Sequence, residues 1–240
     1  MWRDALLVAG KDLRIELRSR VVLNQVLPFG VLVLVLFALA LGPGRSTLLQ
    51  AAPGLFWVAV LFSSVLAVQR SFAIEATDGT RDGLRLAGLE PAGVFLGKAA
   101  AVAVQLAALE IVLGAGVVFL YGAGVRSLWG VTGACLLATL GLAASGTIYG
   151  ALAVGLEVRE TLLPFLLLPV VAPVLLAGTR AWQAALSTGA GSAGSLHGAG
   201  FLGGAGFLGG GDPWIGLLAV FAAVYLSLGV LVFGSIEEAA

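Results

Sequence analysis

The chain has few charged residues for its length. Lys, Arg, Asp and Glu make up 11% of its 240 residues, whereas hydrophobic residues make up 60%. Soluble domains carry roughly 25% charged residues, so this chain cannot cover itself with an ordinary polar surface. The formal net charge of zero argues against a nucleic-acid partner.

Cysteine and histidine are nearly absent. The single cysteine, Cys135, lies in an apolar run, which excludes a disulfide framework and a thiolate metal cluster. The single histidine, His197, lies in a glycine-rich stretch, whereas a catalytic triad or a histidine metal site needs several fixed partners. We therefore expect no catalytic residue and no metal site. His197 is retained as a candidate axial haem ligand, with a solvated loop histidine as the favoured alternative.

An ATP-binding motif is also missing. The nearest segment is GVFLGKAA at Gly93–Ala100. A P-loop has four residues between its glycine and its Gly-Lys pair, followed by a Ser or Thr that holds magnesium. Here the spacer is one residue short and Ala99 follows Lys98. The chain is therefore not expected to hydrolyse ATP or to be an enzyme on its own.

Hydrophobic sequence is abundant. Apolar runs of about 20 residues can cross a bilayer as helices, and these runs lack the alternation that membrane strands require. The sequence predicts an all-α polytopic membrane protein with a single membrane domain over residues 1–240. Residues 21–185 would hold five spans, and residues 214–234 would hold the sixth. The six transmembrane helices are expected at Val21–Leu41, Ala52–Val68, Ala99–Tyr121, Leu128–Gly155, Thr161–Gly178 and Trp214–Gly234.

The basic residues predict the orientation. An even number of spans places both termini on the same side of the membrane. If that side is the cytoplasm, most basic residues lie inside, and only Arg45, Arg126 and Arg180 lie outside. This distribution follows the positive-inside rule, so we expect an N-in/C-in arrangement.

Residues 1–20 are expected to form an interfacial helix. Leu6, Leu13 and Leu17 fall on one stripe, beside a basic flank suited to anionic lipid headgroups. Ile15 falls on the polar side and does not fit this pattern. A charged tail that only sets topology is an equally supported alternative.

Two further segments are unusual in composition. The fifth predicted span contains Pro164, Pro169 and Pro173, and interior prolines remove helical hydrogen bonds. We expect a broken or kinked span of the kind that lines a substrate path, with a merely bent packing helix as the alternative. Residues 186–213 are glycine-rich and are expected to form a flexible periplasmic loop.

Glu110 is the only formal charge well inside a predicted span. Charges at membrane depth are costly and are candidates for functional sites. We consider an intramembrane polar site in a substrate path or gate, with a structural buried hydrogen bond as the favoured alternative. Gln105 is too far around the helix to be an ideal partner. In the fourth span, Gly146 and Gly150 have the spacing that favours close helix packing or self-association into a homodimer.

The segment Ser71–Pro91 is rich in charge. Within it, leucines alternate with charged residues, which predicts a short amphipathic helix over about Thr80–Leu89, with Asp78 as N-cap and Pro91 ending it. By the charge distribution this segment faces the cytoplasm. A surface helix between two spans can receive a push from a cytoplasmic partner, and a solvated connector is the alternative.

The segment Ala52–Lys98 begins with Ala-Pro-Gly and Trp57, continues with Arg-Ser-Phe-Ala at 70–73, and closes with Leu-Gly-Lys at 96–98. With this pattern it resembles the heme exporter protein B family, the permease of cytochrome c maturation. Lys11–Arg20 and Val158–Leu175 are similar to the family as well. The chain departs from the family pattern at Asp78, where Glu is expected, and at the longer or more polar Gly88–Glu90. The matching positions are Ala52, Pro53, Gly54, Trp57, Arg70, Ser71, Phe72, Ala73, Glu75, Asp78, Gly79, Asp82, Gly83, Leu84, Leu86, Pro91, Leu96, Gly97 and Lys98.

The resemblance implies an ABC-2-type permease of the bacterial inner membrane. Its partners would be a cytoplasmic ABC ATPase subunit that binds ATP, a haem-handling membrane protein and a periplasmic haem chaperone. Haem is the implied substrate, and no cofactor is expected to bind this chain tightly. Coupling to the ATPase falls on the cytoplasmic loop 70–98, at Glu75, Asp78, Gly79, Asp82, Leu84, Arg85 and Leu86.

Three questions stay open at this point. The ATP-driven step is either haem export or release of the haem-loaded chaperone. The chain could instead be the permease of another ABC-2 exporter, for a drug, a lipid or a glycan. An ion-coupled secondary transporter with Glu110 as proton carrier ranks last, because no second intramembrane charge or inverted repeat is visible.

Overall fold

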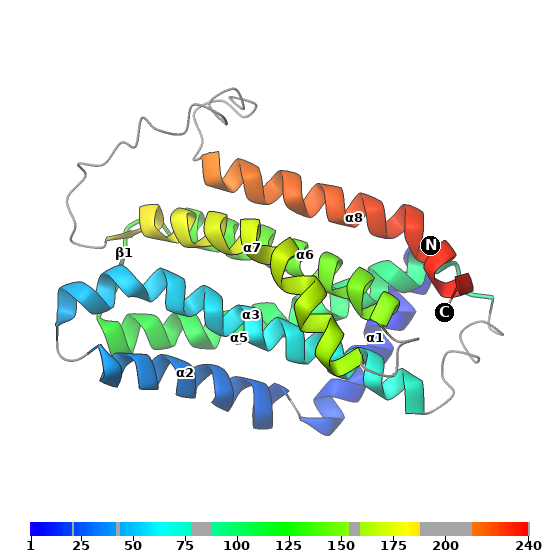
Figure 1. The fold of residues 1–240 in the computed structure, drawn as a ribbon, viewed down its shortest axis with the longest axis horizontal. Coiled ribbons are helices and arrows are strands. Elements are labelled where there is room, and N and C mark those ends of the chain that lie inside the picture. Colours follow the sequence, from blue (N-terminus) through cyan, green and yellow to red (C-terminus); the bar gives the residue numbers. More distant parts are fainter. Residues whose placement is uncertain (21, 42–43, 78–87, 154–158, 188–212, 240) are drawn as a thin grey trace.

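A computed structural model of the chain describes residues 1–20, 22–41, 44–77, 88–153, 159–187 and 213–239 (Figure 1). These residues are almost entirely helical. The elements are α1 (Trp2–Ser19), the π-helical turn η1 (Val22–Val26), α2 (Leu27–Ala40), α3 (Arg45–Thr77), α5 (Pro91–Tyr121), β1 (Gly124–Val125), α6 (Leu128–Ala153), α7 (Arg159–Ala185), β2 (Leu186–Ser187) and α8 (Pro213–Ala239).

Five of the described helices are long and apolar enough to cross a membrane, namely α3, α5, α6, α7 and α8. A sixth crossing is reached only if α1 and the short α2, which meet at a bend of 56°, are counted as one span. The first predicted span, Val21–Leu41, corresponds to η1 and α2, because a π-helical turn interrupts its start. The all-α membrane fold is confirmed, and the count of six spans stays a prediction.

The long helices run alongside one another, and α1 lies across one end of the bundle, which we call the α1 end (Figure 1). Both termini lie at this end, as do the C-terminus of α3 and the N-terminus of α5. Helix α6 contacts α3, α5, α7 and α8, and helix α5 contacts α1, α2, α3, α6 and α8, so these two helices form the centre of the bundle. Because both termini lie at the same end, the chain runs the length of the bundle an even number of times.

Small residues on α6 allow this central position. A Cβ atom on Gly146 would lie 2.7 Å from Cγ2 of Val68, and Gly150 lies directly against the ring of Phe72. Both neighbours belong to α3. The predicted close helix approach at Gly146 and Gly150 is therefore confirmed, and the neighbour is a helix of the same chain. Contacts of this kind stabilise membrane bundles, because lipid tails are as apolar as the side chains and close packing decides the association.

Several predicted boundaries were wrong near the charged segment. Helix α3 continues to Thr77, well past Val68, and α5 begins at Pro91 instead of Ala99. Pro91 was expected to end a loop helix, but it occupies the first turn of α5, where its missing N–H has no cost. Gly88, within the predicted helix Thr80–Leu89, has φ +64° and is not helical, and residues 80–87 lie outside the described residues.

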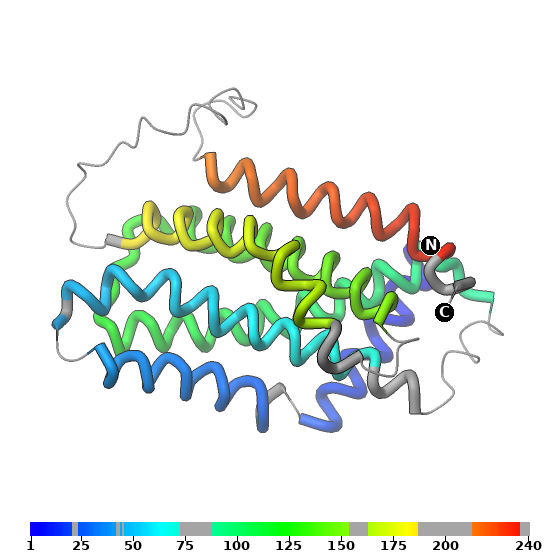
Figure 2. Tube along the Cα trace, viewed as in Figure 1, coloured from blue at the N-terminus to red at the C-terminus, as the bar shows by residue number. Residues whose placement is uncertain are grey.

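Helix α7 contains all three prolines of the fifth predicted span. It is one helix from Arg159 to Ala185, so Pro164, Pro169 and Pro173 do not end it. Its axis bends visibly along its length (Figure 2). Prolines bend helices by removing a hydrogen bond and by pushing the preceding turn away. A role for this bend in a substrate path stays a prediction.

The opposite end of the bundle contains a short sheet that the sequence did not predict. Strands β1 and β2 are antiparallel, with Gly124 opposite Ser187 and Val125 opposite Leu186. The backbone N–H groups of Arg126 and Ser127 both donate to the Ala185 carbonyl at 3.0 Å. Two residues per strand carry too weak a pattern for recognition in a sequence. The glycine-rich segment expected at 186–213 lies outside the described residues from 188 to 212.

Candidate functional site

Most of the predicted coupling residues lie outside the described residues. These are Asp78, Gly79, Asp82, Leu84, Arg85 and Leu86, together with the side chain of Glu75, whose backbone belongs to α3. His197 also lies outside them. The roles proposed for all of these residues stay predictions. The helices on either side of residues 78–87 are described, and they meet α1.

Helix α1 lies against the first turns of α5. The contact is close because α5 carries Gly93 and Gly97, one helical turn apart. A Cβ atom on Gly93 would lie 2.9 Å from the Met1 carbonyl oxygen, and one on Gly97 would lie 2.6 Å from that of Ala5. Any larger side chain would therefore push α1 away from α5.

Two ion pairs accompany this backbone contact. Oδ2 of Asp12 lies 3.6 Å from Nζ of Lys98 on α5, and Oε2 of Glu16 lies 3.7 Å from Nε of Arg70 on α3. Asp12 also pairs with Lys11 at 3.0 Å. The two carboxylates are four residues apart, so they lie on the same face of α1. That face joins α1 to both α3 and α5.

Lys98 is the most deeply buried charge of this group. Its side chain is only 2% exposed, and that of Asp12 is 12% exposed. The Lys98 ammonium lies 4.8 Å from the centroid of the Phe72 ring on α3, a cation–π contact. A buried ammonium is costly without a partner of opposite charge, so the carboxylate of Asp12 stabilises Lys98 in its position.

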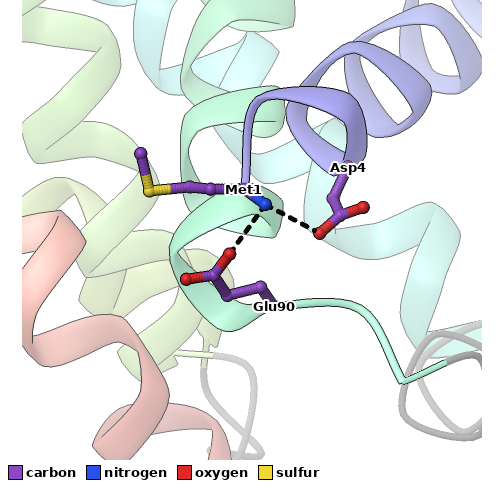
Figure 3. Close-up of polar contacts among 3 residues, drawn as sticks. All are labelled: Met1, Asp4 and Glu90. Carbon is purple, nitrogen blue, oxygen red and sulfur yellow. Dashed lines mark hydrogen bonds and ion pairs between the residues drawn. The ribbon is translucent and has the colours of Figure 1, made fainter.

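The start of α1 is fixed by a third contact. The Met1 amino group lies between two carboxylates, 3.2 Å from Asp4 and 2.7 Å from Glu90, which immediately precedes α5 (Figure 3). The hydrogen bond to Glu90, and then the one to Asp4, raise the pKa of the Met1 amino group above its ordinary value of 8.0. The contact therefore requires a protonated amine.

Helix α1 has three faces rather than the two that its sequence suggested. Of the predicted apolar stripe, Leu6 and Leu17 are each 75% exposed and point away from the protein, whereas Leu13 is half-buried. Ala5 and Val8 are buried against α5. Ile15, which did not fit the two-faced pattern, is half-buried on the same side as Val8. The basic residues Arg3, Arg14 and Arg18 are exposed.

Sequence reasoning missed the protein-facing side of α1. Two signals could have indicated it: the Gly93-x-x-x-Gly97 spacing, and the i, i+4 spacing of Asp12 and Glu16 to one side of the apolar stripe. Neither the phosphate-loop comparison nor the family resemblance of this segment indicates what covers Gly93 and Gly97. In the structure its glycines are covered by the α1 backbone.

Glu110 belongs to a separate polar cluster inside the bundle. The Thr139 hydroxyl on α6 donates to Oε1 of Glu110 at 2.6 Å, and Cys135 makes a further side-chain hydrogen bond to Glu110. The Trp182 indole N–H on α7 donates to Sγ of Cys135 at 3.3 Å. Glu110 thus has partners on α6, as the alternative of a structural hydrogen bond requires. Gln105 is not among the hydrogen-bond partners of Glu110 in the described part of the chain.

Aromatic rings extend the Glu110 cluster to α3. Phe56 stacks on Trp182 with ring centroids 3.8 Å apart, and Trp57 meets Trp182 edge-on at 6.2 Å. The cluster therefore joins α3, α5, α6 and α7. Among the described residues, no group of three or more His, Cys, Asp or Glu side chains is placed to hold a metal ion.

Comparison with known proteins gives a consistent family. A family model described as CcmB protein matches residues 3–200. Heme exporter protein B of Escherichia coli is 37% identical over 177 residues, which cover 72% of this chain and 79% of that protein. Heme exporter protein B of Paracoccus denitrificans is 34% identical over 179 residues, with 74% and 80% covered, and that of Haemophilus influenzae is 31% identical over 178 residues, with the same coverage.

Proposed function

The chain belongs to the CcmB protein family and is a multi-pass, all-α membrane protein, and from this premise we propose that it is the permease subunit of an ABC-type complex for cytochrome c maturation. The observation that supports this most strongly is the family match over residues 3–200, together with relatives named heme exporter protein B. Haem, or a haem-loaded chaperone, is the proposed cargo. The chain acts as a transporter component, not as an enzyme.

ATP hydrolysis is assigned to a separate cytoplasmic ABC ATPase subunit. The only segment that approaches a phosphate-binding loop is Gly93–Ala100, and it lies inside helix α5 with α1 against its glycines. A phosphate loop needs backbone N–H groups that are free to bind phosphate. Here the segment is part of the α5 helix, and α1 covers its glycines, which leaves no room for a nucleotide. The absence of this site from the chain is consistent with a division of labour between two subunits.

We propose an N-in/C-in orientation in the bacterial inner membrane, with six spans and an ABC-2-type architecture. The α1 end then faces the cytoplasm. Two observations support this orientation: both termini lie at the α1 end, and the exposed Arg3, Arg14 and Arg18 lie on α1 itself (Figure 1). The exposed part of the apolar stripe of α1 would rest in the headgroup layer of the bilayer.

The connection between α3 and α5 is the proposed contact with the ATPase. The end of α3 and the start of α5, between which it runs in the sequence, lie at the α1 end, and its sequence contains predicted coupling residues, among them Asp78, Asp82 and Arg85. A haem-handling membrane protein and a periplasmic haem chaperone complete the proposed complex. The ATP-driven step either exports haem or releases the loaded chaperone.

The test is complementation in a strain that lacks its own copy of this permease. Full-length chain, co-expressed with its ATPase, should restore covalent haem in c-type cytochromes and should co-purify with the ATPase. The triple variant D78A/D82A/R85A should lose both. An ATPase variant without hydrolysis, with wild-type permease, should co-purify but not restore the cytochromes.

Two results would count against the proposal. If the triple variant retains both co-purification and maturation, the coupling segment is misassigned. If the wild-type chain restores no cytochromes but exports a drug, lipid or glycan with its ATPase, it is the permease of another ABC-2 exporter. Transport that continues without any ATPase would instead support a secondary transporter.

A further inference from the structure

Helix α1 is joined to both helices that flank the connection between α3 and α5. Glu16 pairs with Arg70, about two turns before the end of α3, and Asp12 pairs with Lys98, about two turns after the start of α5. The amino terminus pairs with Glu90, immediately before α5. One helix from the beginning of the chain therefore bridges the two ends of a connection far from it in sequence.

The geometry of α1 fixes it in two directions. Rotation about its axis would separate Asp12 and Glu16 from their partners, because both carboxylates lie on the same face. Movement toward α5 is blocked at Gly97, where the Ala5 carbonyl is in close contact. An ordinary membrane anchor needs neither feature, because an apolar stripe and basic residues suffice to hold it at the lipid surface.

The ion pairs are also placed where their loss has consequences. Lys98 is buried, so loss of Asp12 would leave its ammonium in a low-dielectric environment. Phe72, which contacts this ammonium, also packs on Gly150 of α6. A shift of α1 would therefore change the packing at the centre of the bundle.

We propose that α1 is a brace that makes the end of α3 and the start of α5 move as one unit, with Asp12 and Glu16 as its positioning residues. This inference rests on the proposed function, which makes the connection between α3 and α5 the contact with the ATPase. A displacement delivered there is carried by α1, α3 and α5 together. Asp12 and Glu16 touch neither nucleotide nor cargo.

The first experiment measures the brace without reference to transport. Hydrogen exchange is followed by mass spectrometry on the full-length chain in lipid nanodiscs. Asp12→Lys places two cations together, so exchange of the α1 amides should rise at least tenfold. The reversed pair D12K/K98D should return it to within threefold of the wild type. The matched control is Arg14→Gln on the exposed face of α1, which should change nothing.

The second experiment measures coupling in the assembled complex with the ATPase. D12K should lower cytochrome c maturation at least fivefold while ATP hydrolysis continues, and D12K/K98D should recover most of the maturation. If D12K does not fold, the milder D12N/E16Q replaces it in both experiments. Its expected results are the same in direction and smaller in size.

The outcomes separate the brace from the proposed function. Unchanged α1 exchange in D12K and in D12N/E16Q, or a reversed pair no better than D12K, overturns the brace. Raised exchange with full maturation also overturns it, because coupling then does not depend on α1. If the wild-type chain supports no maturation at all, the proposed function fails, and the exchange data still show whether α1 is held by its carboxylates.

Discussion

Two side chains, Asp12 and Glu110, illustrate what a carboxylate does in a chain with so few charges. Each is paired with a group on another helix: Asp12 with the Lys98 ammonium, and Glu110 with the Thr139 hydroxyl. The first pair holds an ammonium that is almost fully covered, and the second connects two spans inside the bundle. The stability lost when either carboxylate is replaced therefore depends on the polar group that loses its partner.

Removing Asp12 should destabilise the protein more than removing its partner. Asp12→Ala takes this carboxylate away from the buried Lys98 ammonium, which should lower the free energy of unfolding by up to about 3–5 kcal/mol. Lys98→Met removes the buried charge, and Asp12 keeps its ion pair with Lys11. Thermal unfolding in detergent should therefore show a larger loss for D12A than for K98M. Equal losses would mean that burial of Lys98 is not the cause.

Glu110 should tolerate an amide but not a hydrocarbon. Glu110→Gln keeps an oxygen that accepts from Thr139, whereas Glu110→Leu leaves that hydroxyl without its partner. Interhelical hydrogen bonds of this kind contribute roughly 0.6–1.7 kcal/mol. We expect E110Q to keep wild-type stability and cytochrome maturation, and E110L to melt at a lower temperature. Loss of transport in a stable E110Q protein would instead identify Glu110 as a proton carrier.

At the scale of elements, the association of α1 with α5 depends on backbone contact and on two charged contacts, Asp12 with Lys98 and the Met1 amino group with Glu90. The sequence favoured a surface helix or a tail in equal measure, because its leucine stripe and basic flank fit both. The structure shows most of the leucine stripe exposed and another side of the helix packed on Gly97. A search for one apolar and one polar side therefore detects only part of a helix that has three different faces.

A single methyl group should test this contact. In Gly97→Ala the new Cβ would lie 2.6 Å from the Ala5 carbonyl oxygen, so α1 must shift, at a cost of about 1–3 kcal/mol. Gly133 on α6 has no heavy atom within 4 Å of the corresponding position. The control Gly133→Ala should therefore be neutral or stabilising by up to about 1 kcal/mol. Thermal unfolding of both variants gives the comparison, and equal effects would contradict the close contact.

The start of α1 should loosen at alkaline pH. Its amino group has a raised pKa when it lies between Glu90 and Asp4, and the free amine titrates near 8.0. The stabilisation is therefore complete below pH 8 and is lost as the pH rises through the raised value. Protease cleavage in the first turns of α1 should be faster at pH 10 than at pH 7. In Glu90→Gln this difference should shrink, and an unchanged difference would exclude the Glu90 contact as its cause.

At the scale of the whole molecule, the arrangement of the ends can be tested against the membrane itself. Ser19 lies at the α1 end, and Val125 lies in β1 at the opposite end. In a C135S background, a membrane-impermeant thiol reagent applied to intact cells with a permeable outer membrane should label Val125→Cys. It should label Ser19→Cys only after the inner membrane is opened. The reverse pattern would invert the proposed orientation.

The sequence alone determined that this protein lies in a membrane and that its fold is all-α. Its apolar runs of about 20 residues are long enough to cross a bilayer. In lipid such a run forms a helix, because every backbone N–H and C=O group must find its hydrogen-bond partner within the segment. The motifs around Trp57 and Lys98 also indicated the family that the comparisons confirmed. Both conclusions rest on local composition and spacing, which need no knowledge of distant contacts.

Only the tertiary structure decided which residues act together. That Asp12 meets Lys98, that Glu110 meets Thr139, and that Gly97 touches Ala5 are contacts between helices far apart in the chain. The pattern on one helix indicates which side is apolar, but it does not say which neighbour covers the other sides. That choice depends on how closely small residues let two backbones approach, and this is a property of helix pairs.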